Sequence, residues 1–167
     1  MRLKITIPQI FIITLFCLFV VQSCRIGADL EADGALLSHS GCKNFDNEAS
    51  QGRYTLSDSS HECLEYSYAG NVLRIKHINA AFNCCLDKIT GSVGIEGNII
   101  RIESNGILTN GQGCFCDCLY DVEFEVKNLL PAVYRIVCST FTHSLEIDLT
   151  QTTSDRYCEP RDHYPWN

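Results

Sequence analysis

The sequence predicts an all-β protein whose core is an antiparallel β-sandwich of about seven short strands, between residues 63 and 150. Three observations lead to this fold class. Apolar and polar side chains alternate in short segments, which is the period of a strand with one buried face. Gly and Asn residues that favour turns separate these segments at short intervals. No segment has the apolar spacing of a helix, so the segments are expected to pair with one another.

The strands are predicted from this alternation and from the turns between them. Ala69 and Gly70 separate the first two strands, and Gly97 and Asn98 separate the next two. Such dipeptides between alternating segments are typical of β-hairpins. The expected strands are residues 63–68, 71–78, 88–96, 99–103, 113–126, 133–139 and 145–149.

The fifth of these strands contains the longest alternating stretch. In an extended chain, successive side chains point to opposite faces of the sheet. One face of this strand would then carry cysteines and apolar residues, while the acidic residues Asp117, Asp121, Glu123 and Glu125 would lie on the other face. The residues expected on the first face are Cys114, Cys116, Cys118, Tyr120, Val122, Phe124 and Val126.

The sixth strand supports a narrower fold prediction. The segment 129–137 resembles the turn into the penultimate strand of fibronectin type III and related immunoglobulin-like domains. In those domains a tyrosine hydroxyl donates a hydrogen bond to the backbone a few residues earlier, and Tyr134 has the matching place here. The resemblance implies an immunoglobulin-like sandwich and carries no information on activity.

The N-terminal residues 1–23 have the pattern of a signal peptide. Arg2 and Lys4 give a positive start, and an uncharged apolar run follows from Ile10 to Val21. The run ends before Cys24 in a sequence that resembles the lipobox of bacterial lipoproteins, in which the cysteine is diacylated and becomes the mature N-terminus. Two or three acyl chains would anchor the protein stably in a membrane of the cell envelope. The alternative is ordinary cleavage near Ser23, which leaves Cys24 as a thiol.

The mature chain is acidic. Removing residues 1–23 takes away two basic residues and no acidic one, which leaves 11 basic against 20 acidic residues and a net charge of −9. Nucleic acid is therefore excluded as a partner, because phosphate binding requires clustered Lys and Arg. Residues 24–62 are predicted to form a lipidated tether and an irregular lead-in. The acidic residues 29–33 are interpreted as a solvated part of this tether, although they resemble the export signals of some lipoproteins.

Nine cysteines remain after the signal peptide and Cys24, and such a density in an exported domain predicts disulfides. The adjacent pair Cys84 and Cys85 is too close to form an unstrained bridge. Alternate residues of a strand are at the far edge of the allowed range, so the fifth-strand cysteines should not pair with one another. The simplest solution joins Cys84 and Cys85 to two of those three and leaves one thiol unpaired. The disulfide candidates are Cys42, Cys63, Cys84, Cys85, Cys114, Cys116, Cys118, Cys138 and Cys158.

A metal site is the competing interpretation of the same residues. Thiolates together with an imidazole suit Zn²⁺ or Cu(I). The ligands would be His77, Cys84, Cys85, Cys116 and Cys118. Their spacing is not that of a zinc finger or ribbon, and an oxidising compartment favours disulfides, so no cofactor is expected. His77 is then expected to be a buried imidazole, bonded to backbone or to Asn79 or Asn83.

Three motifs together resemble a family of uncharacterised secreted lipoproteins of Bacteroidetes-type bacteria. They are residues 77–85 (HINAAFNCC), 114–121 (CFCDCLYD) and 164–166 (YPW). The resemblance extends from about Cys42 to the C-terminus and implies location in the outer membrane or cell envelope, with no catalytic residue to transfer. Residues 151–167 are expected to be an aromatic tail that Cys158 fastens and that packs on the domain through Trp166.

The predicted function is that of a lipid-anchored envelope protein without catalytic activity, which serves as a binding or structural module for a protein or glycan ligand. The first alternative is a metal-binding envelope protein that uses the thiolates and His77. The second alternative is a cysteine-dependent enzyme, which would need a base beside the thiol to lower its pKa. No phosphate-binding loop, serine elbow or zincin motif occurs in the sequence.

Overall fold

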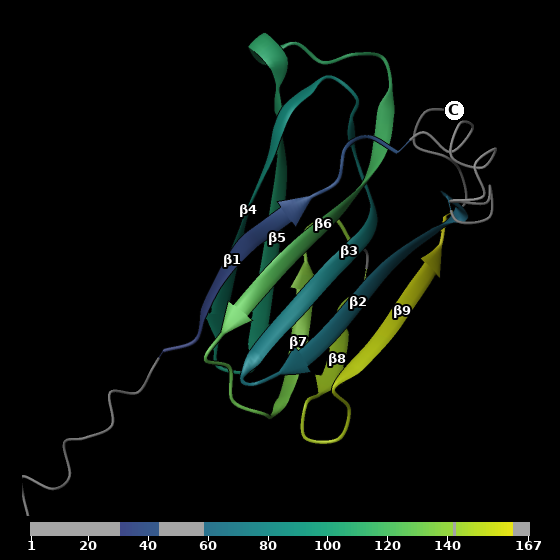
Figure 1. The fold of residues 1–167 in the computed structure, drawn as a ribbon. Coiled ribbons are helices and arrows are strands. Elements are labelled where there is room, and N and C mark those ends of the chain that lie inside the picture. The colour runs from purple at the N-terminus through teal and green to yellow at the C-terminus, as the bar shows by residue number, and fades with distance from the viewer. Residues whose placement is uncertain (1–30, 44–58, 142, 162–167) are drawn as a thin grey trace, which may run out of the picture. The chain divides into compact units, whose positions relative to one another are not determined.

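The structure, a computed structural model, describes residues 31–43, 59–141 and 143–161. These residues form an all-β fold in which nine strands make one mixed sheet, with the order β8-β7-β5-β4-β1-β6-β3-β2-β9 (Figure 1). No α-helix occurs in these ranges. The strands are β1 (Asp33–His39), β2 (His61–Ala69), β3 (Val72–Asn83), β4 (Leu86–Glu96), β5 (Ile99–Leu108), β6 (Asp117–Lys127), β7 (Val133–Cys138), β8 (Leu145–Asp148) and β9 (Ser154–Pro160).

Both predicted hairpins are confirmed, although the first turn lies one residue later than Ala69 and Gly70. Ala69 pairs with Val72, so the β2–β3 turn has two residues, Gly70 and Asn71, with φ angles of 58° and 62°. Positive φ at both positions defines a turn whose twist matches that of the strands, and Gly and Asn adopt it at low cost. A second two-residue turn joins β4 to β5, and there Gly97 has a φ of 57°.

The sheet has one weak seam, because β1 and β4 share a single residue pair, Ala35 with Ser92. On one side of the seam lie β8, β7, β5 and β4, and on the other lie β1, β6, β3, β2 and β9. Both halves contribute to one cluster of buried apolar side chains. The largest of them that are fully buried are Phe124, Leu64, Leu73, Ile75, Ile100, Ile102, Leu129 and Ile136. Burial of apolar surface between the two halves therefore holds the fold together.

Three details of the predicted fold are wrong. The described residues contain nine strands, whereas about seven were expected, and β5 and β7 pair in parallel. β1 lies within the predicted tether and β9 within the predicted tail. β9 escaped prediction because nearly all of its side chains are exposed, so it has no apolar alternation; its seven residue pairs with β2 hold it in the sheet.

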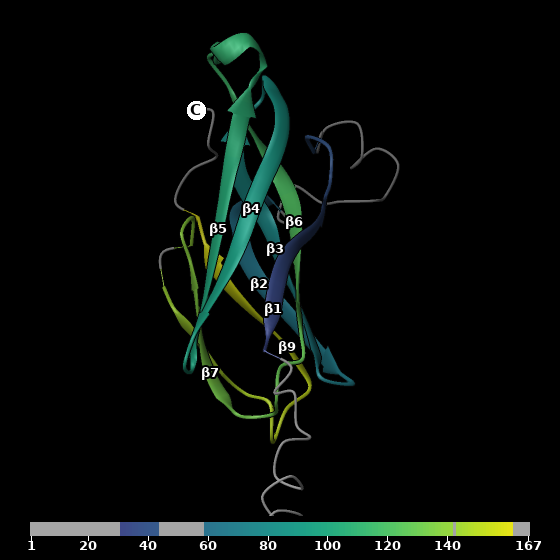
Figure 2. The ribbon, with the colours of Figure 1, turned by 90° about the vertical axis from the view of Figure 1, so that its left-hand side faces the viewer.

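The alternation predicted for residues 113–126 is confirmed from Tyr120 onward only, because Leu119, between Cys118 and Tyr120, is buried as well. Cys118, Tyr120, Val122, Phe124 and Val126 are buried, and Phe124 has no exposed surface. β6 begins at Asp117, however, so the two cysteines before it are not on the strand. They belong to a loop that connects β6 to a short 3-10 helix, η2 (Thr109–Gly111), at the end of β5 (Figure 2).

The tyrosine predicted to fix a corner does so. The hydroxyl of Tyr134 donates a hydrogen bond of 2.9 Å to the carbonyl oxygen of Leu130, four residues earlier. The ring is buried at the start of β7, so the bond fastens the β6–β7 connection to the core.

Several predictions fall on residues that the structure does not describe. The signal peptide, the lipidation site Cys24 and the Trp166 end of the tail all lie outside the described ranges. Within those ranges, no helix has the length and apolar character needed to span a membrane.

Candidate functional site

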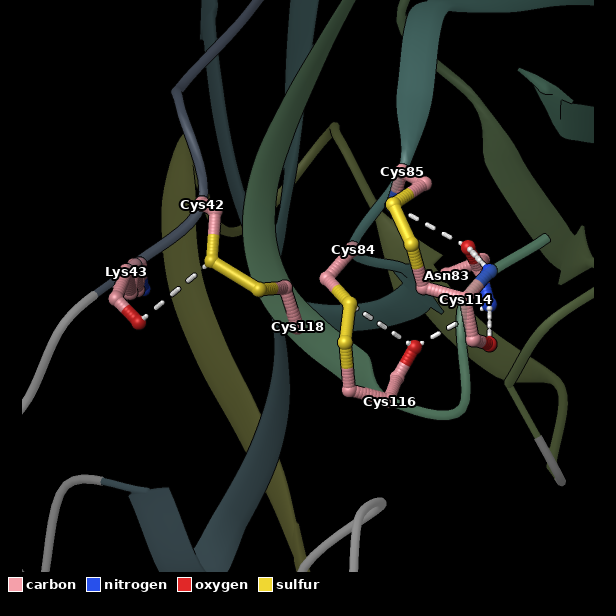
Figure 3. Close-up of a disulfide and its surroundings, with 8 residues drawn as sticks. All are labelled: Cys42, Lys43, Asn83, Cys84, Cys85, Cys114, Cys116 and Cys118. Carbon is pink, nitrogen blue, oxygen red and sulfur yellow. Dashed lines mark hydrogen bonds between the residues drawn. A yellow bond between two sulfur atoms is a disulfide. The ribbon is translucent and has the colours of Figure 1, made fainter. Parts of the chain in front are cut away.

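The vicinal cysteines are each bridged to a cysteine of the loop before β6. Cys84 pairs with Cys116 and Cys85 with Cys114, with Cα–Cα distances of 5.7 and 5.6 Å (Figure 3). Such distances are ordinary for disulfides. Both bridges thus connect the end of β3 to residues 113–116, which we call the clamped loop. The sequence predicted that Cys84 and Cys85 pair with two of the three alternating cysteines, and the structure has this arrangement; which two was left open.

The side-chain amide of Asn83 reinforces the clamped loop through four hydrogen bonds (Figure 3). Its Nδ2 donates to the carbonyl oxygens of Cys114 and Cys116, at 2.7 and 3.0 Å. Its Oδ1 accepts from the backbone N–H groups of Cys85 and Cys114, each at 3.0 Å. The backbone N–H of Cys84 also donates to the carbonyl of Cys116 at 3.1 Å. Two covalent bonds and five hydrogen bonds therefore fix the backbone on both sides of one residue, Phe115.

Phe115 is the most exposed large apolar side chain among the described residues. Its relative exposure is 111%, so the ring is as open to water as in an extended chain. No residue from Ser104 to Cys116 carries a charge, and Ile107 nearby in the sequence is 42% exposed. An apolar ring on a rigid, uncharged loop is the arrangement of a binding anchor, because little conformational freedom is lost when it is buried by a partner.

The two other disulfides each join neighbouring parts of the sheet, one in its interior and one at its β9 edge. Cys42 pairs with Cys118 and joins the segment after β1 to the start of β6. Cys63 pairs with Cys158 and joins β2 to the edge strand β9, as expected for a bridge that fastens the C-terminal segment. The remaining described cysteine, Cys138, is free and buried.

The alternative metal site is not assembled as predicted. Cys84, Cys85 and Cys114 have sulfur atoms within 4.8 Å of one another. In the structure, however, each of these sulfurs is in a disulfide, and so are Cys116 and Cys118, so none is a thiolate that could ligate a metal. The hydrogen-bond partners of His77 are Glu62, Cys138 and Thr140, and none of them belongs to the predicted metal site.

His77 lies at the centre of a second group of polar side chains, within the core. Its ring is 0% exposed, and its Nε2 is 2.5 Å from Oε1 of Glu62. On the other side its Nδ1 lies 3.7 Å from Sγ of Cys138 and 3.3 Å from Oγ1 of Thr140. The predicted burial of His77 is confirmed, but the expected partners Asn79 and Asn83 are wrong. The group is a thiol, an imidazole and a carboxylate in line.

The environment shifts two of these groups toward their charged forms. Burial alone would lower the pKa of His77, but the hydrogen bonds to Cys138 and Glu62 raise the pKa to about 9. Burial alone would raise the pKa of Cys138, yet the bond to His77 lowers it. A thiolate beside an imidazolium is the form in which a cysteine acts as a nucleophile. Cys138 is only 3% exposed, however, which excludes a bulky substrate.

A bulge in β3 at Asn79, two residues after His77, is contacted by two cations. Asn79 has a φ of 63° and its register with β6 shifts there. The ammonium of Lys43 donates to Asn79 Oδ1 at 2.7 Å and lies 2.5 Å from Asp121. The guanidinium of Arg161 donates to the carbonyl of Asn79 and lies 2.9 Å from Glu62. These contacts join the chain before β2 and after β9 to the sheet, so the bulge has a structural role.

Sequence reasoning missed Phe115, Glu62 and Cys138 as members of these sites. Phe115 could have been found from its place between two cysteines that were expected to pair, in an uncharged run. Glu62 and Cys138 had no such signal, since they are 15 and 61 residues from His77. No family model, curated protein or solved structure matches the chain. The resemblance to secreted lipoproteins therefore stays a prediction.

Proposed function

We propose that this chain is a lipid-anchored protein of the cell envelope that acts as a non-catalytic binding module and engages its ligand with the clamped loop. The observation that carries the proposal is the full exposure of Phe115 between two bridged cysteines. A phenylalanine ring that is exposed to water contributes nothing to the stability of the fold. Two disulfides beside it hold the loop in one conformation, which a loop without a partner does not need. Burying such a ring in a partner contributes about 2–3 kcal/mol to binding.

The position of the clamped loop agrees with this proposal. β1 begins at Asp33, which pairs with Lys127 at the far end of β6. The clamped loop precedes the near end of β6, at Asp117. The strand has 11 residues, and at about 3.4 Å per residue the two ends are about 34 Å apart. The chain therefore enters β1 beside the end of β6 that is opposite to the clamped loop.

We also propose that the sheet is an immunoglobulin-like sandwich. The single residue pair between β1 and β4 divides the strands into two layers, and the buried side chains come from both. The corner formed by Tyr134 supports the same assignment. The parallel pair of β5 and β7 distinguishes this fold from a wholly antiparallel sandwich.

The binding proposal is tested with two envelope preparations of the producing bacterium, peptidoglycan sacculi and outer-membrane vesicles. The mature protein, Phe115→Ala and Leu130→Ala are each sedimented with both. Leu130 is a matched control, because it is 68% exposed but lies beyond the opposite end of β6. We expect Phe115→Ala to weaken binding at least about tenfold and Leu130→Ala to leave it unchanged. Equal binding by the two variants, or no binding of the mature protein to either preparation, would refute the role of the loop.

The anchoring proposal has its own test. Cys24→Ser removes the only cysteine that stands at the end of the lipobox-like sequence. We expect the unchanged protein to sediment with membranes and the variant to be released into the soluble fraction, because the acyl chains supply the membrane affinity. A variant that remains with the membranes would show that another segment provides the attachment.

A second candidate function follows from the three clustered sulfur atoms. In a reduced protein, Cys84, Cys85 and Cys114 could supply three thiolates within 4.8 Å of one another, a set that suits Zn²⁺ or Cu(I). Isolation under reducing conditions followed by elemental analysis tests it. One tightly held metal ion per chain would favour this function over the disulfide-clamped loop.

A further inference from the structure

Cys138 differs from the other described cysteines in both bonding and surroundings. It is the free one, at the end of β7, and its sulfur faces the ring of His77. The ring in turn is held by Glu62 of β2, and Arg161 after β9 holds Glu62. Cys138, His77, Glu62 and Arg161 therefore form a continuous series of contacts from the sulfur to the guanidinium, which we call the line. A spare thiol in an apolar core would not require such an alignment.

The line has the geometry that activates a thiol. A nucleophilic cysteine needs a base within reach of its sulfur and a third group that orients the base. Here Nδ1 of His77 is 3.7 Å from the sulfur, and the carboxylate of Glu62 fixes Nε2 at 2.5 Å. The hydroxyl of Thr140 lies 3.6 Å from the same sulfur and can donate to a thiolate. The charges would alternate from thiolate to imidazolium, carboxylate and guanidinium, so that no charge in the line lacks a partner.

Burial restricts what can react with this thiol. Cys138 is 3% exposed, and Phe141 packs with its ring edge-on to His77 at 5.9 Å. Thr140, which touches the sulfur, is itself exposed, so the sulfur lies just below the surface. A peptide or an acyl substrate would not reach it in this conformation. Hydrogen peroxide, which is only slightly larger than water, is a reagent that fits the restriction.

We infer that Cys138 is a site of oxidation by hydrogen peroxide, which converts its thiolate into a sulfenic acid. The sulfur lone pair attacks one peroxide oxygen, the S–O bond forms and the O–O bond breaks. The leaving hydroxide takes the proton from the His77 imidazolium and departs as water. The sulfur is oxidised by two electrons and the peroxide is reduced by two. This reactivity is independent of any ligand at the clamped loop.

The product has no thiol partner within the described part of the chain. The eight other cysteines there are in four disulfides. An intramolecular disulfide therefore cannot form among these residues without exchange, and the sulfenic acid persists in the folded protein.

The test measures the rate of sulfenic acid formation in the intact mature protein, with hydrogen peroxide as the reagent. At each time point catalase removes the peroxide, the protein is unfolded in urea that contains dimedone, and the trapped adduct is read by mass spectrometry. In the unchanged protein we expect the rate to rise less steeply between pH 7 and pH 8 than that of an ordinary thiol, because the hydrogen bond to His77 lowers the pKa of Cys138. An ordinary thiol, with a pKa of about 8.5, would gain about eightfold over the same interval. His77→Gln is expected to restore that steep dependence and to slow the reaction about tenfold at pH 6.

His39→Gln is the matched control, since His39 is an exposed histidine on β1 and should leave both the rate and the profile unchanged. If His77→Gln fails to fold, the profile of the unchanged protein decides alone, and Thr140→Val, at an exposed position, gives a second variant that should slow oxidation. An eightfold rise in the unchanged protein, a folded His77→Gln variant with the same profile, or a Cys138 that peroxide does not modify would each overturn the inference.

Discussion

The two disulfides of the clamped loop should stabilise the protein in a strongly coupled way. Cys84–Cys116 and Cys85–Cys114 have sequence separations of 32 and 29 residues, so each closes almost the same loop of the unfolded chain. In the chain-entropy description, closing a loop of this size contributes about 3.7 kcal/mol to the free energy of unfolding. Once one bridge exists, the other closes a ring of only about five residues and adds about 2 kcal/mol.

Removing either bridge should therefore lower the free energy of unfolding by about 2 kcal/mol, and removing both should lower it by about 6 kcal/mol. Two bridges that acted independently would instead each cost about 3.7 kcal/mol when removed, and about 7 kcal/mol together. The variants are Cys84→Ala with Cys116→Ala, Cys85→Ala with Cys114→Ala, and all four together. Urea unfolding followed by circular dichroism measures the cycle. If the loss for the fourfold variant equals the sum of the two single losses, the bridges are not coupled. That result would refute the reasoning that either bridge supplies most of the stability and the second mainly immobilises the loop.

Three further predictions concern stability. Phe115→Ala should change the free energy of unfolding by less than about 0.5 kcal/mol because the ring is exposed, whereas Phe124→Ala in the core should cost about 3–5 kcal/mol; urea unfolding of both variants checks this. Tyr134→Phe removes one hydrogen bond to backbone and should cost about 1 kcal/mol in the same assay; no loss would mean that the corner is not stabilising. His77, with its pKa raised from 6.5 to about 9 on folding, contributes stability that is present below pH 6.5 and lost as the pH rises to 9. Cys138, with its pKa lowered from 9.0, contributes stability that is present above pH 9 and lost as the pH falls through its folded pKa. The two slopes oppose each other at each pH below 9 where both groups titrate, so stability should be nearly flat there. A slope of a whole proton in urea titrations just below pH 9 would contradict the ion pair.

The strands whose alternation could be recognised in the sequence are those that contribute to the core. β3 and β6 bury one face along much of their length, so their period is visible. β1 and β9 gain their place from backbone pairing with β6 and β2, and their side chains are mostly exposed. Backbone hydrogen bonds leave no side-chain signal, which is why these two strands were assigned to a tether and a tail.

The disulfides could be narrowed from the sequence because local geometry excludes some pairs. Adjacent and alternate cysteines cannot easily bridge, and this restriction favoured bridges from Cys84 and Cys85 to two of the three alternating cysteines, as the structure has them, without specifying which two. The partners of His77 were beyond such an argument. They lie on β2 and β7, and their meeting depends on the packing of the two halves of the sheet, which no local pattern specifies.

The prediction of the fifth strand failed for a related reason. The alternating cysteines were read as part of β6, but the disulfides to Cys84 and Cys85 hold them in a loop before it. Alternation was therefore correct from Tyr120 onward and accidental before Asp117. That distinction matters for function, since it places Phe115 on an exposed loop rather than on a face of the sheet.

The most direct test of the account is disulfide mapping of the non-reduced mature protein by peptide mass spectrometry, together with thiol counting and elemental analysis for zinc and copper. We expect the four pairs Cys42–Cys118, Cys63–Cys158, Cys84–Cys116 and Cys85–Cys114, with a single free thiol at Cys138 and no bound metal. Free thiols at the vicinal cysteines together with a stoichiometric metal ion would contradict it and would make those cysteines a metal centre.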